Sequence, residues 1–96
     1  MDESRKKLLF YHEVVSVTRA YLGPAAERFI DRQVTNHLHK EPEALEPGDL
    51  HKLIDWIRVA LSLITEDTRV VEEYSEKLQE LIMNAEVHKE HHGSKH

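Results

Sequence analysis

The sequence predicts an all-α fold, a bundle of four mostly antiparallel helices, and three observations support this prediction. Apolar residues recur at three- and four-residue spacing through four long runs, which is the period of one helix face. The three glycines and three prolines fall between these runs, where helix boundaries are expected. At 96 residues the chain has room for one domain, and no segment shows the alternating pattern of a β-strand.

The first two predicted helices span residues 4–22 and 24–39, and meet at Gly23-Pro24. Glycine can end a helix, and proline suits the first turn of the next one, where its missing N–H costs nothing. Along residues 4–22 the main apolar stripe consists of Leu8, Tyr11, Val15, Thr18 and Leu22. The inner face of residues 24–39 consists of Ala26, Phe29, Ile30, Gln33, Val34, His37 and Leu38.

A connection of about ten residues, 40–49, separates the second and third helices, which is long for a helical bundle. It contains Pro42 and Pro47-Gly48, and its Ala44 and Leu45 are candidates to fold over the end of the bundle. Asp49 is the predicted N-cap of the third helix.

The third predicted helix, residues 50–64, is the most hydrophobic of the four. A helix that is apolar around most of its circumference is either central to the fold or shared with a partner. The fourth spans residues 67–88, with Thr65 or Asp67 as its cap. We therefore expect one helical domain over residues 1–87 and a flexible, His-rich tail over 88–96.

Composition and charge exclude several classes of function. The chain has no cysteine, which excludes disulfides, thiolate catalysis and thiolate metal sites. Its net charge of −5 is concentrated as acid in the last quarter, and no basic stripe predicts nucleic-acid binding. No apolar segment is long enough to span a membrane, so we expect a soluble, cytoplasmic protein. The acidic face is either simply solvated or a docking face for a basic partner.

Motifs for catalysis are missing from the sequence. The three glycines leave none for a phosphate-binding loop, and no serine lies in a nucleophile elbow, so we expect neither an enzyme nor a bound cofactor. His88, His91 and His92 have the i, i+3, i+4 spacing that brings imidazoles onto one helix face. The alternative function is therefore a metal- or cofactor-responsive helical protein; the simpler reading is a solvated terminal segment.

The best candidates for partner binding are Trp56 and Arg58 on the third helix, because tryptophan and arginine are enriched among interface hot spots. Phe10, Val17 and Tyr21 form a second candidate edge on the first helix. The competing explanations are core packing for Trp56, and burial of the second edge beneath residues 40–49. The surplus of apolar surface favours binding of a protein partner, with a homodimer as one form of it.

The segment Tyr21-Leu22-Gly23-Pro24-Ala25-Ala26 resembles a Leu-Gly-Pro-x-Ala corner of small helical modules in prokaryotic signalling and regulatory proteins. Residues 50–57, Leu-His-Lys-Leu-Ile-Asp-Trp-Ile, are similar to the third helix of that pattern. The resemblance covers about residues 15–65 and contains no catalytic residues. It implies a non-enzymatic regulatory or protein-interaction role.

Overall fold

The computed structural model describes the backbone of residues 2–93 and the side chains of residues 8–85. Within this range the chain is helical and contains no strand, which confirms the predicted all-α class. Its elements are α1 (Asp2–Leu22), the short 3₁₀ turn η1 (Gly23–Ala25), α2 (Ala26–Leu38), the 3₁₀ turn η2 (Pro42–Ala44), α3 (Pro47–Ile64) and α4 (Thr68–Gly93).

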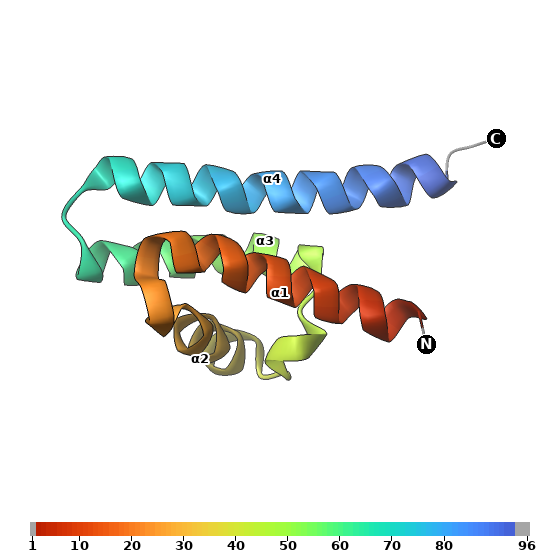
Figure 1. The fold of residues 1–96 in the computed structure, drawn as a ribbon, viewed down its shortest axis with the longest axis horizontal. Coiled ribbons are helices and arrows are strands. Elements are labelled where there is room, and N and C mark those ends of the chain that lie inside the picture. Colours follow the sequence, from red (N-terminus) through yellow and green to blue (C-terminus); the bar gives the residue numbers. More distant parts are fainter. Residues whose placement is uncertain (1, 94–96) are drawn as a thin grey trace.

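Helices α1, α3 and α4 lie along the long axis of the molecule, and α4 runs antiparallel to the other two (Figure 1). Helix α2 lies across them and is seen end-on in Figure 1. The arrangement at α2 therefore differs from the expected side-by-side antiparallel packing. The physical reason is that two tight 3₁₀ turns, η1 and η2, redirect the chain on either side of α2.

A single apolar core joins all four helices and the connection between α2 and α3. Tyr11, Val14, Val15 and Thr18 show the three- and four-residue spacing that directs one face of α1 into this core. Leu8, expected on the same face, is 40% exposed. The buried apolar residues are Phe10, Tyr11, Val14, Val15, Ala26, Ile30, Val34, Leu45, Leu50, Leu53, Ile54, Ile57, Leu61, Val71, Tyr74, Leu78 and Ile82.

Two residues with left-handed backbone mark the ends of α2. Gly23, just before it, has φ +63°, a conformation that glycine adopts without a steric penalty. His39, just after it, has φ 55°, and its backbone N–H donates to the carbonyl of Thr35 at 3.2 Å. A left-handed residue in this position closes the helix by satisfying a free carbonyl.

Helix α3 begins three residues earlier than predicted, because Glu46 and not Asp49 is its N-cap. The backbone N–H of Glu46 donates to Asp49 Oδ2 at 3.1 Å, and the side chain of Glu46 accepts from the backbone of Asp49. This reciprocal capping box satisfies two amides at the start of the helix. Lys40 Nζ also donates to Asp49 Oδ2, at 2.6 Å, and ties the end of α2 to the start of α3.

A polar pair lies inside the core between α1 and α4. The Thr18 hydroxyl donates to the carbonyl of Val14 at 2.7 Å, and Tyr74 Oη lies 2.5 Å from Thr18 Oγ1. Since the single proton of the Thr18 hydroxyl is already used, Tyr74 is the donor in this second bond. Both residues are almost fully buried, so each needs the other as a partner.

Burial raises the pKa of Tyr74 well above its usual value of 10.0, more strongly than its bond to Thr18 lowers it. The unfolded chain ionises this tyrosine above pH 10 while the folded chain keeps it neutral, so folding stability is lost as the pH rises past 10. We expect Tyr74→Phe to lower the free energy of unfolding by about 1 kcal/mol at neutral pH. Above pH 10 the wild type loses stability through Tyr74 and the variant does not, so the difference between their free energies of unfolding should narrow. Urea unfolding over this pH range measures both effects. A difference in free energy of unfolding that stays constant with pH would contradict the raised pKa of Tyr74.

Candidate protein-binding surface

The side of α3 that faces away from the core carries a row of exposed apolar side chains. Trp56, Val59 and Leu63, named here the α3 stripe, are 52%, 57% and 85% exposed, while Ile64, the last residue of α3, lies on the core-facing line of Ile57 and is 59% exposed. Trp56, Val59 and Leu63 are spaced by three and four residues, which places them along one line of the helix surface. The opposite side of α3 is buried in the core. Helix α3 is therefore apolar on two sides, and only one of them is covered by this chain.

On one border of the α3 stripe, Trp56 is held by α2. The His37 ring stacks on the Trp56 indole, with ring centroids 4.2 Å apart and planes 12° from parallel. This contact fixes the orientation of an indole that is still half exposed. A side chain that is already ordered loses little conformational freedom on binding, which makes Trp56 a suitable anchor.

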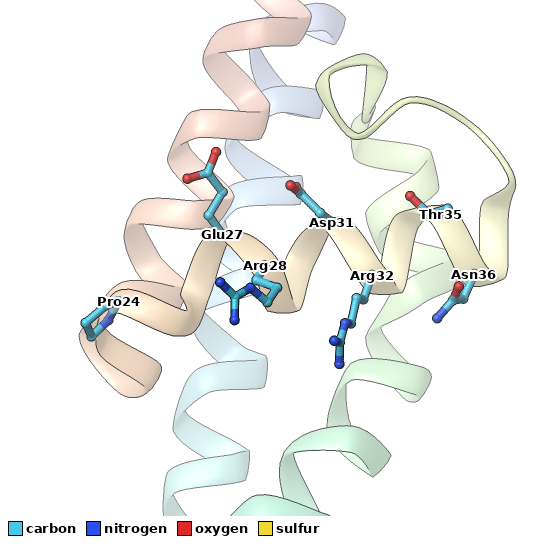
Figure 2. A pocket seen from close by; sticks show the side chains of 7 residues that line it. All are labelled: Pro24, Glu27, Arg28, Asp31, Arg32, Thr35 and Asn36. Atoms are coloured by element: carbon cyan, nitrogen blue, oxygen red, sulfur yellow. The ribbon is translucent and has the colours of Figure 1, made fainter.

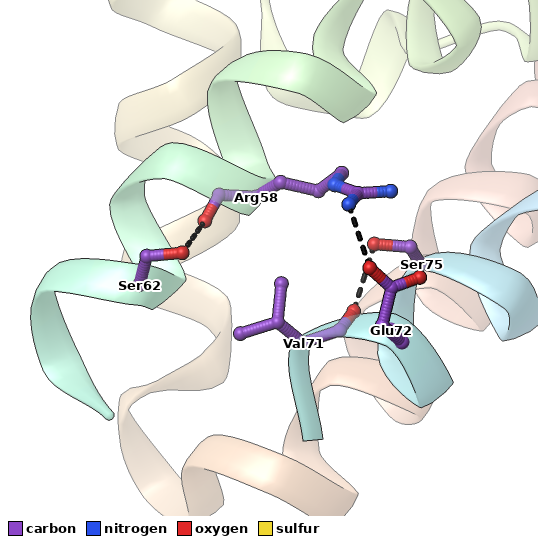
Figure 3. Close-up of polar contacts among 5 residues, drawn as sticks. All are labelled: Arg58, Ser62, Val71, Glu72 and Ser75. Atoms are coloured by element: carbon purple, nitrogen blue, oxygen red, sulfur yellow. Dashed lines mark hydrogen bonds and ion pairs between the residues drawn. The ribbon is translucent and has the colours of Figure 1, made fainter. Parts of the chain in front are cut away.

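On the side of α3 that faces α4, Arg58 connects the two helices (Figure 3). Its guanidinium lies 2.9 Å from the carboxylate of Glu72, and Ser62 Oγ donates to the backbone carbonyl of Arg58 at 2.8 Å. In Figure 3 the Arg58 side chain extends toward α4. An exposed ion pair contributes only about 0–1 kcal/mol to stability. The structure therefore pairs Arg58 with Glu72 of its own chain through a weak surface contact, and direct contact of Arg58 with a partner stays a prediction.

The second predicted edge, on α1, lies against the core. Phe10 is only 7% exposed and belongs to the same buried cluster as Leu45, so its expected role as a surface contact is corrected here. Val17 and Tyr21 are partly buried against the core, and the Tyr21 ring lies 5.1 Å from that of Tyr74. Helix α1 also packs against η2. For Phe10, the burial beside Leu45 therefore fits the competing explanation that residues 40–49 cover this edge.

The histidines proposed as metal ligands lie near the end of α4. The backbone of α4 continues to Gly93, beyond the boundary expected at residue 88. The side chains of His88, His91 and His92 lie outside the described residues. Over the part of the chain whose side chains are described, no group of three or more His, Asp or Glu residues is placed to hold a metal ion.

A shallow hollow lies on the outer side of α2, shown in Figure 2. None of its lining residues is buried, and all come from α2 or from the corner that precedes it. Asp31 accepts a hydrogen bond from Tyr11 Oη at 2.6 Å, so part of its polar surface is already used. The lining residues are Pro24, Glu27, Arg28, Asp31, Arg32, Thr35 and Asn36. One face of a single helix cannot enclose a substrate, and the hollow is a weaker candidate than the α3 stripe.

The sequence pointed to Trp56 but not to Val59 or Leu63 as binding residues. The available signal was the excess of apolar residues around α3, which did not show which side the core would leave uncovered. No family model, curated protein or solved structure matches the chain. Among the described residues, none of the helices is both long and apolar enough to cross a bilayer.

Proposed function

We propose that this protein is a non-enzymatic helical interaction module that binds protein through the α3 stripe. The observation that supports this function best is the row of three large apolar side chains, Trp56, Val59 and Leu63, each more than half exposed. Single exposed apolar residues are common on protein surfaces, but a contiguous row of them is typical of an interaction site.

The shape of the surface favours a helical or grooved protein partner. Apolar residues at three- and four-residue spacing on an exposed helix match the anchor pattern of helix-in-groove recognition. Trp56 contributes the largest contact area and is held in place by His37. We propose that α1 and α4 serve as the scaffold that presents α3, and that the four helices act as a bundle crossed by α2.

The cellular setting is part of the same proposal. The Leu22-Gly23-Pro24 corner resembles that of prokaryotic signalling modules, which supports a regulatory role in the cytoplasm. In such a role the chain would act by binding and not by chemistry, in keeping with the missing catalytic motifs.

Photo-crosslinking tests this function directly. We expect a photoreactive amino acid at Leu63 to form adducts with protein when cells producing the chain are illuminated, because this side chain is 85% exposed at the proposed contact. Met83 on α4 is the matched control, since it is also apolar and 61% exposed but lies outside the α3 stripe. Mass spectrometry identifies the adducts. Equal labelling from both positions, or none from Leu63, would contradict the proposed function.

A further inference from the structure

We propose that the α3 stripe binds a second copy of this chain, with the two α3 helices packed antiparallel about a two-fold axis near Val59. This inference rests on the proposed function and names its partner. It is supported by two properties of α3: the distribution of large and small side chains along the stripe, and the charges at its two ends.

The sizes of the side chains suit an antiparallel pair of identical helices. In a two-fold interface each residue that contacts a second residue is contacted by it in return. With the axis beside Val59 and Ala60, Trp56 of the first copy faces Leu63 of the second. By symmetry, Leu63 of the first copy faces Trp56 of the second. The smaller Val59 and Ala60 lie at the crossing point, where helices approach to about 8–10 Å. The large side chains of Trp56 and Leu63 therefore pack on both sides of the crossing point, where the smaller Val59 and Ala60 let the helices come close.

The charges at the ends of the α3 stripe are complementary in the same register. Lys52 lies one turn before Trp56 on α3, and Glu66 lies just beyond the C-terminal end of α3, in the connection to α4; both are exposed. An antiparallel pair brings Lys52 of each copy toward Glu66 of the other. A parallel pair would instead place Lys52 beside Lys52. Within the described residues neither side chain forms an ion pair in its own chain, so both charges remain available for this contact.

The extent of the surface indicates a weak dimer. From Lys52 to Leu63 the α3 stripe covers eleven residue steps, or about 16 Å of helix. Stable interfaces bury about 800 Å² on each partner, which is more than one short helix face supplies. We therefore expect a dimer that forms and dissociates with concentration, in roughly the micromolar range.

Sedimentation equilibrium over a series from low micromolar to near-millimolar protein tests the self-association. We expect the wild type to shift from monomer to dimer, and Leu63→Glu to weaken the dimer by at least about thirtyfold, because it places a carboxylate in the apolar contact. Met83→Glu is the control and should leave the dimer unchanged. Since both side chains are exposed, circular dichroism should show folding like the wild type for each variant.

Charge reversal tests the antiparallel register. Lys52→Glu and Glu66→Lys should each weaken the homodimer by about three- to tenfold at low salt, because like charges then meet at both ends. An equimolar mixture of the two variants should form a heterodimer more tightly than either variant forms its homodimer, since opposite charges are restored at both ends. If the heterodimer in the mixture were no tighter than the two variant homodimers, the antiparallel register would be overturned.

The outcomes separate the partner from the function. A wild-type chain that stays monomeric throughout, while Leu63 crosslinks to a different protein, would overturn the dimer and leave the proposed function intact. Dimerisation that Leu63→Glu does not weaken would place the contact elsewhere and contradict the inference. A monomeric chain with no crosslinks from Leu63 would overturn both.

Discussion

Leu45→Ala is expected to destabilise the fold by about 2–5 kcal/mol, although Leu45 belongs to no helix. The side chain follows η2 and is fully buried in the core that joins α1, α2, α3 and α4. Truncation removes buried methyl groups and leaves a cavity that the surrounding helices fill only in part. A chain of this length has about 5–15 kcal/mol of stability in total, so a large part of it would be lost.

Urea unfolding of Leu45→Ala beside Glu41→Ala measures the effect. Glu41 lies in the same connection but is exposed, so its truncation should change the free energy of unfolding by less than about 0.5 kcal/mol. If both substitutions had small effects, the connection would not be part of the core.

Phe10→Ala is expected to cost about 3–5 kcal/mol of stability, because this ring is buried and not part of a binding edge. Thermal unfolding checks it, with Leu9→Ala as the neighbouring control. Leu9 is 56% exposed on the same turn of α1, so its substitution should leave the melting temperature almost unchanged. If Phe10→Ala instead left stability intact and weakened binding, the original interpretation of this edge would be restored.

Local sequence signals predicted most of the helix boundaries. Gly23 and Pro24 mark the corner between α1 and α2, where the backbone requires φ +63°. Asp67 caps α4, as one of the two predicted candidates, by accepting from the backbone N–H of Arg69 at 3.0 Å. These features depend on the conformational preferences of single residues, which one sequence shows directly.

Tertiary features were harder to predict. The crossing of α2 and the burial of Leu45 depend on how distant segments meet, which helical periodicity does not specify. The N-cap of α3 is Glu46 and not the predicted Asp49, because the helix already begins at Pro47. Asp49 lies inside the first turn, where it completes the capping box. The binding surface was hard to predict because α3 is apolar on both sides, and the sequence does not show which side faces the core. Only the packing of α2 and α4 around it shows that Val59 and Leu63 stay uncovered.

The most direct test of the central claim is a crosslinking scan around α3, with a photoreactive residue placed in turn at each exposed position from Lys52 to Ile64. If the α3 stripe is the binding surface, adduct yield should follow the helical period, with maxima at Trp56, Val59 and Leu63 and minima at Ser62 and Ile64. A yield that is uniform around the helix, or that peaks at Ser62 and Ile64, would contradict binding through the α3 stripe.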